Sequence, residues 1–169
     1  MPSSSIEIRP LEREDVIVVH DLAHIIWPPT FKDILTPQQI DYMLELMYSE
    51  ESLKNQIDEG CKMFVILISK KPSGYLSIEH NKENSGRTKI HKIYLLPESQ
   101  GTGAGRILMD FANDQASKMG DKAIYLNVNK YNQAIGFYEH YGFEKKFMED
   151  IDIGEGYLME DWVMEKSFL

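Results

Sequence analysis

The sequence predicts an α/β fold in one domain over residues 1–169, with a mixed central sheet of about six to seven strands flanked by about four helices. Residues 63–68 (MFVILI) form an apolar run typical of a strand buried on both faces. Apolar residues from Ile107 to Met119 recur at helical spacing, and a strand pattern follows at residues 123–128. Strand and helix patterns therefore alternate. The 169 residues are enough for one core and few for two.

The first part of the chain predicts a strand followed by a helix. Residues 6–9 alternate between apolar and charged side chains, as a short strand does, and residues 14–26 carry apolar side chains at helical spacing. Pro28 and Pro29 cannot continue a helix in the ordinary way, because proline lacks the backbone N–H and disfavours helix in the residue before it. We therefore expect an aromatic-rich loop at residues 27–31.

Two N-cap signals predict the next helices. Thr36 is followed by Pro37 at the first helical position and by Gln39 at the third, which is the capping-box arrangement. Ser49 stands where it can cap a further short helix. Two helices are therefore expected between the aromatic segment and the apolar strand.

Turn signals divide the rest of the chain. Residues 71–74 and 84–86 predict turns that lead into strands at residues 75–80 and 88–96. The helix that follows is predicted to end near Gly120.

After the strand at 123–128, the pattern predicts a short helix at residues 133–141, ended by Gly142. The tail predicts two strands that turn at residues 154–156.

Composition excludes several classes of partner. The net charge is −9, from 18 basic and 27 acidic side chains, which repels nucleic acid and favours cationic small molecules or basic peptides. No apolar run approaches the roughly 20 residues of a membrane span, and residues 1–5 have no leader pattern, so we expect a cytoplasmic protein with no membrane partner. Cys61 is the only cysteine and the histidines show no ligand spacing, so we expect no metal site.

Three glycines in five residues connect a strand to a helix. Gly101, Gly103 and Gly105 have no Cβ, so backbone N–H groups can point inward together and a bulky anion can approach the main chain. The helix N-terminus adds its positive dipole end. The chain lacks the Gly-x-Gly-x-x-Gly and Gly-Lys-Ser/Thr patterns of the two commonest phosphate sites. The turn indicates a phosphate-binding site of another type, with a flexible turn before a helix as the alternative.

Residues 100–105 (QGTGAG) resemble the Gln/Arg-x-x-Gly-x-Gly/Ala signature of the GNAT superfamily of N-acetyltransferases. Residues 93–97 (IYLLP) are similar to the family's fourth strand, and residues 132–143 are similar to its Asn…Phe-Tyr-x-x-x-Gly-Phe segment. The order of predicted elements matches the family over almost the whole chain. The resemblance implies a single-domain GNAT-like fold, with splayed fourth and fifth strands, and an acyltransferase that uses acetyl-CoA.

The resemblance also implies where coenzyme A binds. Its pyrophosphate would lie on the N–H groups of residues 101–106, with Gln100 shaping the turn and Arg106 beside the phosphates. The pantetheine arm would pair with the backbone of Ile93 and Leu95. The implied coenzyme-binding residues are Ile93, Leu95, Gln100, Gly101, Thr102, Gly103, Ala104, Gly105 and Arg106, joined by Asn129 or Asn132.

Tyr138 matches the family's general acid, which protonates the departing thiolate. In many members the asparagine lies one residue further from this tyrosine, so Asn129 and Asn132 stay as alternatives. Many relatives have a glutamate on the fifth strand where Asn127 stands here, which leaves the general base open.

Two residues are candidates for the general base. An alkyl ammonium group has a pKa of about 10.4, so the site must remove its proton. By the period of two along a strand, Glu79 shares a face with Tyr75 and Ser77, and His91 shares one with the backbone-pairing residues at 93 and 95. Either could take the proton through a water, and an ordinary solvated position is the alternative for each.

The resemblance places residues 27–31 and the helix bearing Tyr42 on the acceptor side, with core packing as the alternative for these aromatic residues. Negative charge there favours a primary amine of a polyamine or another small cationic amine, acetylated by direct attack in a ternary complex. The acidic residues expected near that side are Glu79, Asp33, Asp41 and Glu45. Protein N-terminal or lysine acetylation and a non-catalytic acyl-CoA-binding module are the alternatives, and a homodimer is left open.

Overall fold

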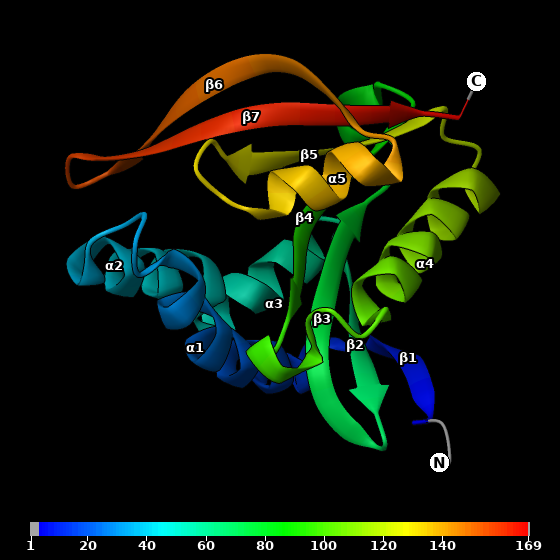
Figure 1. Cartoon of the computed structure of the whole chain (residues 1–169), viewed down its shortest axis with the longest axis horizontal. Helices are drawn as coiled ribbons and strands as arrows, with labels where there is room; N and C mark the ends of the chain where they lie inside the picture. The colour runs from blue at the N-terminus through cyan, green and yellow to red at the C-terminus, as the bar shows by residue number, and fades with distance from the viewer. Residues whose placement is uncertain (1–3, 169) are drawn as a thin grey trace.

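In the described part of the chain, seven strands form one mixed sheet in the order β1-β2-β3-β4-β5-β7-β6 (Figure 1). The computed structural model describes residues 4–168, so what we expect of residues 1–3 lies outside the described residues. Strands β4 and β5 are parallel and all other neighbours are antiparallel. In chain order the strands are β1 (Ile6–Leu11), β2 (Lys62–Ile68), β3 (Lys71–Glu79), β4 (Arg87–Leu95), β5 (Ala123–Asn129), β6 (Glu144–Gly154) and β7 (Tyr157–Ser167).

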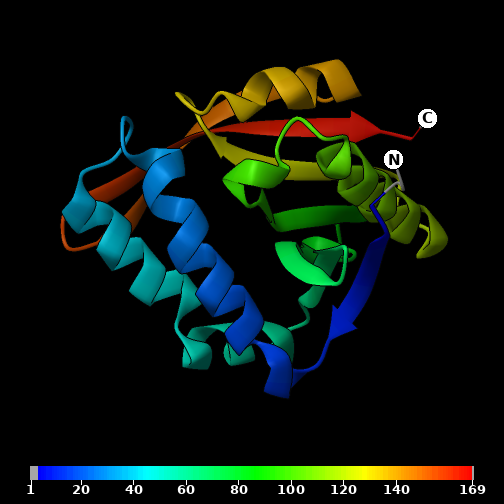
Figure 2. The ribbon, with the colours of Figure 1, turned by 60° about the horizontal axis from the view of Figure 1, so that its bottom comes forward.

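Within residues 4–168, five α-helices cover the two faces of this sheet, in agreement with the predicted elements (Figure 2). One apolar core joins α1, α2 and α3 to one face, and a second core joins α4 and α5 to the other. Within the described residues, no helix is long and apolar enough to cross a membrane. The helices are α1 (Ile17–Phe31), α2 (Pro37–Tyr48), α3 (Glu50–Asp58), α4 (Ala104–Lys118) and α5 (Ala134–Tyr141).

Helix α1 continues through Pro28 and Pro29 to Phe31, so the predicted loop is wrong. Each proline lacks an N–H and leaves a carbonyl one turn earlier, on His24 or Ile25, without its intrahelical donor. Both of those residues are exposed, so water can reach their carbonyl groups. The helix therefore loses hydrogen bonds on its solvent side while its aromatic residues stay in the core.

The N-cap predictions are confirmed at α2 and α3. Thr36 Oγ1 accepts from the backbone N of Gln39 at 3.1 Å, and Ser49 Oγ accepts from that of Ser52 at 3.2 Å. The capping box is incomplete, because Gln39 Nε2 donates instead to the carbonyl of Leu158 at 3.0 Å. This hydrogen bond ties α2 to the β6–β7 hairpin.

The turn between β2 and β3 lies at Ser69 and Lys70 rather than at residues 71–74, which is a correction. Both residues are left-handed, with φ of +50° and +67°. This geometry matches the two-residue turns that follow the twist of a hairpin. Strand β3 therefore begins earlier than predicted, since non-glycine residues took the positive φ angles.

The apolar face predicted for α4 is too wide. Leu108, Ala112 and Ala116 are fully buried, whereas Ile107 and Met119 are 41% and 55% exposed. Small residues in the buried stripe allow the helix to approach the sheet closely.

Gly74 on β3 allows β4 to approach closely. An added Cβ would meet the carbonyl oxygen of Tyr94 and lie 2.7 Å from Leu95 Cδ2. We expect Gly74→Ala to lower the free energy of unfolding by about 1–3 kcal/mol. The control is Gly136→Ala in α5, where no atom lies within 4 Å of the added Cβ, and it should change stability by less than about 1 kcal/mol or raise it. Urea denaturation at pH 7 measures both, and equal effects would contradict the close approach.

Candidate functional site

Strands β4 and β5 pair at one end and separate at the other. Their pairing ends at Ile90 and Leu126, although β4 continues to Leu95 and β5 to Asn129. The predicted splay of these strands is confirmed. Because β3 occupies the opposite edge of β4, backbone groups of β4 that face the gap are free to pair with an extended ligand.

A β-bulge explains where the two strands part. Ser77 and Ile78 of β3 pair with Lys92 and Ile90 of β4, so His91 between them is an extra residue with no partner on β3. A bulge bends its strand and increases the local twist. It falls directly after Ile90, the last residue of β4 that pairs with β5.

The glycine turn lies at the end of β4 and leads into α4. Gly101 and Gly103 have left-handed φ angles of +73° and +90°, and no atom lies within 4 Å of the position that a Cβ would occupy. Gly103 is the N-cap residue and offers no side-chain cap. Among the described residues, none accepts a hydrogen bond from the backbone amides of Gly105 and Arg106. Free amides beside open space at a helix N-terminus suit an anionic group.

The remaining residues of the turn have structural contacts. Thr102 Oγ1 donates to the Ser99 carbonyl at 2.6 Å, and Gln100 Nε2 lies 3.4 Å from the carbonyl of Leu95. Ala104 is fully buried. Gly105 has no positive φ, unlike Gly101 and Gly103, and an added Cβ there would contact Leu95 and Phe137. The predicted role of Gly105 in anion binding therefore depends on its backbone amide alone.

A cavity of about 890 Å³ runs from the glycine turn along the gap between β4 and β5. This volume lies in the range of sites that enclose a substantial organic ligand. Trp27, Phe31, Met43 and Met159 line the opposite end. The predicted site residues that line it are His91, Ile93, Leu95, Gln100, Gly101, Gly103, Gly105, Arg106, Asn129, Asn132 and Tyr138, while Glu79, Thr102 and Ala104 lie outside its lining.

Tyr138 lies on α5 and lines the cavity. Its ring packs edge-on against Phe137 and Phe143, with centroids 5.7 and 5.9 Å away. No described residue forms a hydrogen bond with its hydroxyl. Burial raises the pKa of Tyr138 above the ordinary value, so the hydroxyl is protonated at neutral pH and can donate.

Asn129 and Asn132 both line the cavity and both shape the turn between β5 and α5. Asn129 Oδ1 accepts from the backbone N of Tyr131 at 2.9 Å, and Asn132 Oδ1 accepts from that of Ala134 at 2.8 Å. Each keeps its amide NH₂ group for a ligand. Which of the two contacts the coenzyme therefore stays open.

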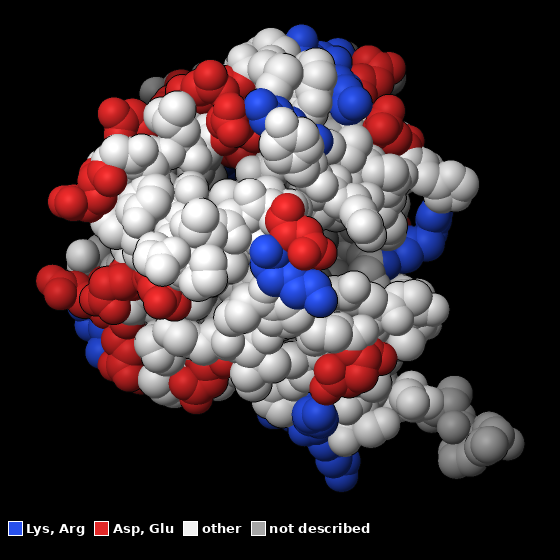
Figure 3. Space-filling model, turned by 60° about the vertical axis from the view of Figure 1, so that its left-hand side comes forward, with Lys and Arg blue, Asp and Glu red and all other residues white. Residues whose placement is uncertain are grey.

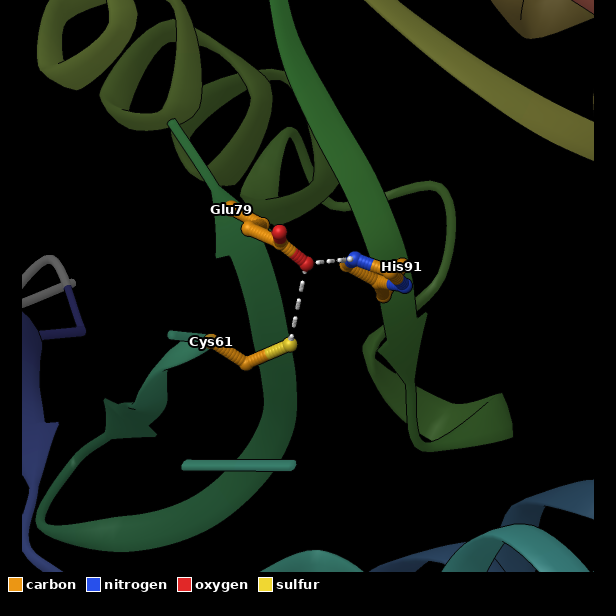
Figure 4. Close-up of side chains that lie close together, drawn as sticks. All are labelled: Cys61, Glu79 and His91. Atoms are coloured by element: carbon orange, nitrogen blue, oxygen red, sulfur yellow. Dashed lines mark hydrogen bonds and ion pairs between the residues drawn. The ribbon is translucent and has the colours of Figure 1, made fainter. Parts of the chain in front are cut away.

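Glu79 and His91 contact each other, as Figure 4 shows. His91 Nε2 lies 3.0 Å from a Glu79 oxygen, which is also 3.9 Å from the Cys61 sulfur. The bulge turns His91 toward this cluster, so it does not share the face of Ile93 and Leu95, which pack with the α4 core. That part of the face prediction is wrong.

Positive charges lie near the cluster of Cys61, Glu79 and His91. Burial, followed by the charge of Lys89, lowers the pKa of His91 to about 4, although its hydrogen bond with Glu79 opposes the shift. Lys82 Nζ lies 3.5 Å from the second Glu79 oxygen. The Cys61, Glu79 and His91 donor atoms lie within 4.8 Å of one another, but these neighbouring positive charges oppose a bound cation.

The sequence interpretation missed Asp161 on β7. This residue is 2% exposed and lines the cavity, and its carboxylate lies 3.5 Å from Asn127 Nδ2. Burial raises the pKa of Asp161 to about 6, against the effect of that hydrogen bond. Met159, Asp161 and Val163 share one face by the period of two, so an acid between apolar residues was a detectable signal.

The acceptor-side prediction needs one correction. Tyr42 does not line the cavity, because its hydroxyl donates to the carbonyl of Ile153 at 2.5 Å and its ring stacks on Tyr157. Lys92 was not predicted, yet it lines the cavity with its ammonium 4.5 Å from the Tyr48 ring, and burial lowers the pKa of this lysine to about 8.

Comparison with known proteins decides the family. Residues 31–164 match the model of a GNAT acetyltransferase domain. The chain belongs to this family. This GNAT protein is therefore an N-acetyltransferase, an enzyme of the acyltransferase class, with the mixed sheet of that fold.

Three similar proteins match this GNAT enzyme over nearly their whole length. It is 28% identical over 167 residues to a spermidine N(1)-acetyltransferase of Thermoplasma acidophilum, covering 97% of this chain and 98% of the relative. The PaiA N-acetyltransferase from Thermoplasma acidophilum, solved in complex with coenzyme A, is 25% identical with a TM-score of 0.81 and coverage of 97% and 99%. A GCN5-related N-acetyltransferase from Rhodopseudomonas palustris, 18% identical, has the same fold with a TM-score of 0.82 and 99% of each chain covered.

Proposed function

We propose that this enzyme transfers the acetyl group of acetyl-CoA to a primary amine of a small cation such as a polyamine, by direct attack in a ternary complex. The observation that carries the proposal is the one cavity that runs from the glycine turn, past Tyr138, to an end that holds Asp33 and Asp161. The spermidine N(1)-acetyltransferase among its relatives supports a cationic acceptor.

The residues of the turn fit the phosphates of the coenzyme. The space beside Gly101 and Gly103 is open, and the amides of Gly105 and Arg106 are free. The exposed Arg106 side chain lies at the same helix N-terminus and adds positive charge. The bound coenzyme supplies an activated acetyl thioester.

The free edge of β4 suits the extended arm of the coenzyme. Ile93 and Leu95 lie beyond the last β4–β5 pair, so their backbone groups on the gap side can form strand-like hydrogen bonds with amides of the arm. Asn129 at the end of β5 and Asn132 in the turn that follows line the same cavity and offer their side-chain amides. Together these groups direct the thioester toward Tyr138.

Tyr138 acts as the donor to the departing sulfur in this proposal. Its buried hydroxyl has a raised pKa, is therefore protonated at neutral pH and has no described protein acceptor to compete for its hydrogen. A donor that is already in place stabilises negative charge as it develops on the leaving group.

Charge supports the choice of a cationic acceptor. Acidic side chains form several large groups around the face drawn in Figure 3, where basic groups are fewer. Asp33 lines the cavity and is exposed, so it can attract a cation from solvent. Glu79, Asp41 and Glu45, which also predicted negative charge on this side, do not line the cavity.

Gly103→Val tests the phosphate site. The added side chain would occupy the open space beside the free amides, so we expect acetyl-CoA binding to fall below detection in calorimetry. Gly156→Val is the matched control, because Gly156 at the β6–β7 turn has a similar φ of +80° and open surroundings. Both variants carry the same backbone strain. Equal acetyl-CoA affinity in the two would overturn the assignment of the turn.

Tyr138→Phe tests the donor. We expect kcat to fall by about 10²- to 10⁴-fold while the Kd for acetyl-CoA stays unchanged, because the hydroxyl acts on the departing sulfur. Tyr141→Phe on the same helix is the control, since the hydroxyl of Tyr141 donates to Asp110 outside the cavity. Steady-state kinetics and calorimetry check both variants, and an unchanged kcat in Tyr138→Phe would remove this residue from the mechanism.

Salt dependence tests the acceptor class. We expect kcat/KM for spermidine to fall as ionic strength rises, because salt shortens the reach of the acidic field to a Debye length of about 8 Å at 0.15 M. An amine of similar size with one charge should show a weaker dependence. Rates measured from low to high salt, with a peptide bearing a free N-terminus as a third acceptor, check this. Preference for the peptide would contradict a small-amine acceptor.

A further inference from the structure

Asp161 is the buried carboxylate of the cavity. Among the described residues that line the cavity, Asp33 and Asp161 are those with carboxylates, and Asp33 is exposed whereas Asp161 is 2% exposed. The Asn127 contact involves one oxygen of Asp161 only, and at 3.5 Å it is long. A buried carboxylate with unused acceptor capacity is costly unless it has a function or a cationic partner.

The position of Asp161 relates it to the proposed donor. It pairs with Asn129 across β5 and β7, at the end of β5 from which the chain enters the turn before α5. Burial raises the pKa of Tyr94, which lines the cavity from β4, and nearby Tyr48, Tyr138 and Asp161 add to this shift. The donor and the carboxylate therefore lie around the same part of the cavity.

The charged groups that act on Asp161 lie on two strands. Lys89 lies on β4, and Glu149 and Asp150 lie on β6. The nearby acids and burial favour the protonated form, whereas Lys89 and the Asn127 hydrogen bond favour the carboxylate. The balance leaves a group that can hold or release a proton near neutral pH.

The two bases predicted from sequence, Glu79 and His91, are each less suited to this role. Glu79 lies outside the cavity lining and contacts His91, Lys82 and Cys61. His91 lines the cavity, but with a pKa of about 4 it binds protons weakly at pH 7. Asp161 lines the cavity, and its pKa is raised rather than lowered.

We infer that Asp161 is a catalytic residue, which receives the ammonium group of the acceptor and removes its proton before attack. The inference rests on the proposed amine acetylation and names the base of that reaction. A buried carboxylate in the cavity also selects for a cationic amine over a neutral one, since an isolated buried charge gains most from an opposite charge.

In this reaction, Asp161 and Tyr138 each transfer one proton. The ammonium nitrogen gives one proton to the Asp161 carboxylate, and its freed lone pair forms the C–N bond as the C–S bond breaks. The sulfur takes the proton of the Tyr138 hydroxyl. The surplus proton on the new amide nitrogen returns to the Tyr138 oxygen through water, and the proton on Asp161 leaves to solvent.

Asp161→Asn is the first test. Because the base must be unprotonated, kcat/KM of the wild-type enzyme should fall as pH drops through about 6, and the variant should lose about 10²-fold or more of kcat/KM at pH 8. The Kd for acetyl-CoA should not change. Glu160→Gln is the matched control, because this neighbouring carboxylate pairs with Lys130 and does not line the cavity. It should keep the wild-type rate and pH profile.

Two further measurements separate catalysis from a structural role. Glu149→Gln removes a charge that raises the pKa of Asp161, so the acid limb of the wild-type profile should move to lower pH. Calorimetry at pH 6, in buffers of different ionisation enthalpy, should show release of about half a proton when spermidine binds the enzyme–CoA complex, and none in Asp161→Asn. If Asp161→Asn does not fold, the shift in Glu149→Gln decides the matter.

The outcomes distinguish the two proposals. A folded wild-type enzyme that binds acetyl-CoA but acetylates no small amine contradicts the proposed function. An active wild-type enzyme whose Asp161→Asn variant keeps its rate and its acid limb overturns the role of Asp161 alone.

Discussion

The separation of β4 from β5 is the constraint on which the site depends. Two parallel strands inside one sheet would normally satisfy each other's backbone groups along their whole length. Here the extra residue His91 bends β4 where the pairing with β5 ends, and the polar backbone beyond Ile90 has no strand on its β5 side. The gap must be filled by a ligand or by water, and this requirement places the cavity in the middle of the sheet.

Packing on both faces keeps the gap open. The close approach of Gly74 to Tyr94 holds the separated part of β4 against β3, while the rings of Trp27 and Tyr75 support Tyr94 from the α1 side. On the other face the buried Tyr138 packs with Phe143 below the gap. The splayed region is therefore rigid on its β3 side and open on its β5 side, which suits a site that orders a long flexible ligand.

Local signals predicted the parts of the fold that local chemistry determines. The caps at Thr36 and Ser49 and the turn before β7 were correct, because each depends on a few neighbouring residues. Pro28 was misinterpreted because the exposure of the carbonyl one turn earlier, which makes the proline tolerable, is a tertiary property. The bulge at His91 is also tertiary, since nothing in an alternating strand marks which residue will lack a partner.

The same difference between local and tertiary properties explains why the sequence could predict one end of the cavity better than the other. The end at the glycine turn is built from one continuous segment, so a short motif describes it. At the other end, α1 and α2 meet the β6–β7 hairpin, which is held by the Gln39 contact with Leu158 and the Tyr42 contact with Ile153. Each of these hydrogen bonds joins residues more than 100 positions apart.

The electrostatics of that end depend on burial. Asp161 is 2% exposed although its strand lies near the edge of the sheet. An exposed aspartate would attract a cation weakly and would be unprotonated far below neutral pH. Burial makes the same group both a stronger partner for an ammonium ion and a better proton acceptor, because it disfavours the isolated charge. In the proposed reaction, selection of a cation and removal of its proton would both follow from one structural cause, the burial of Asp161.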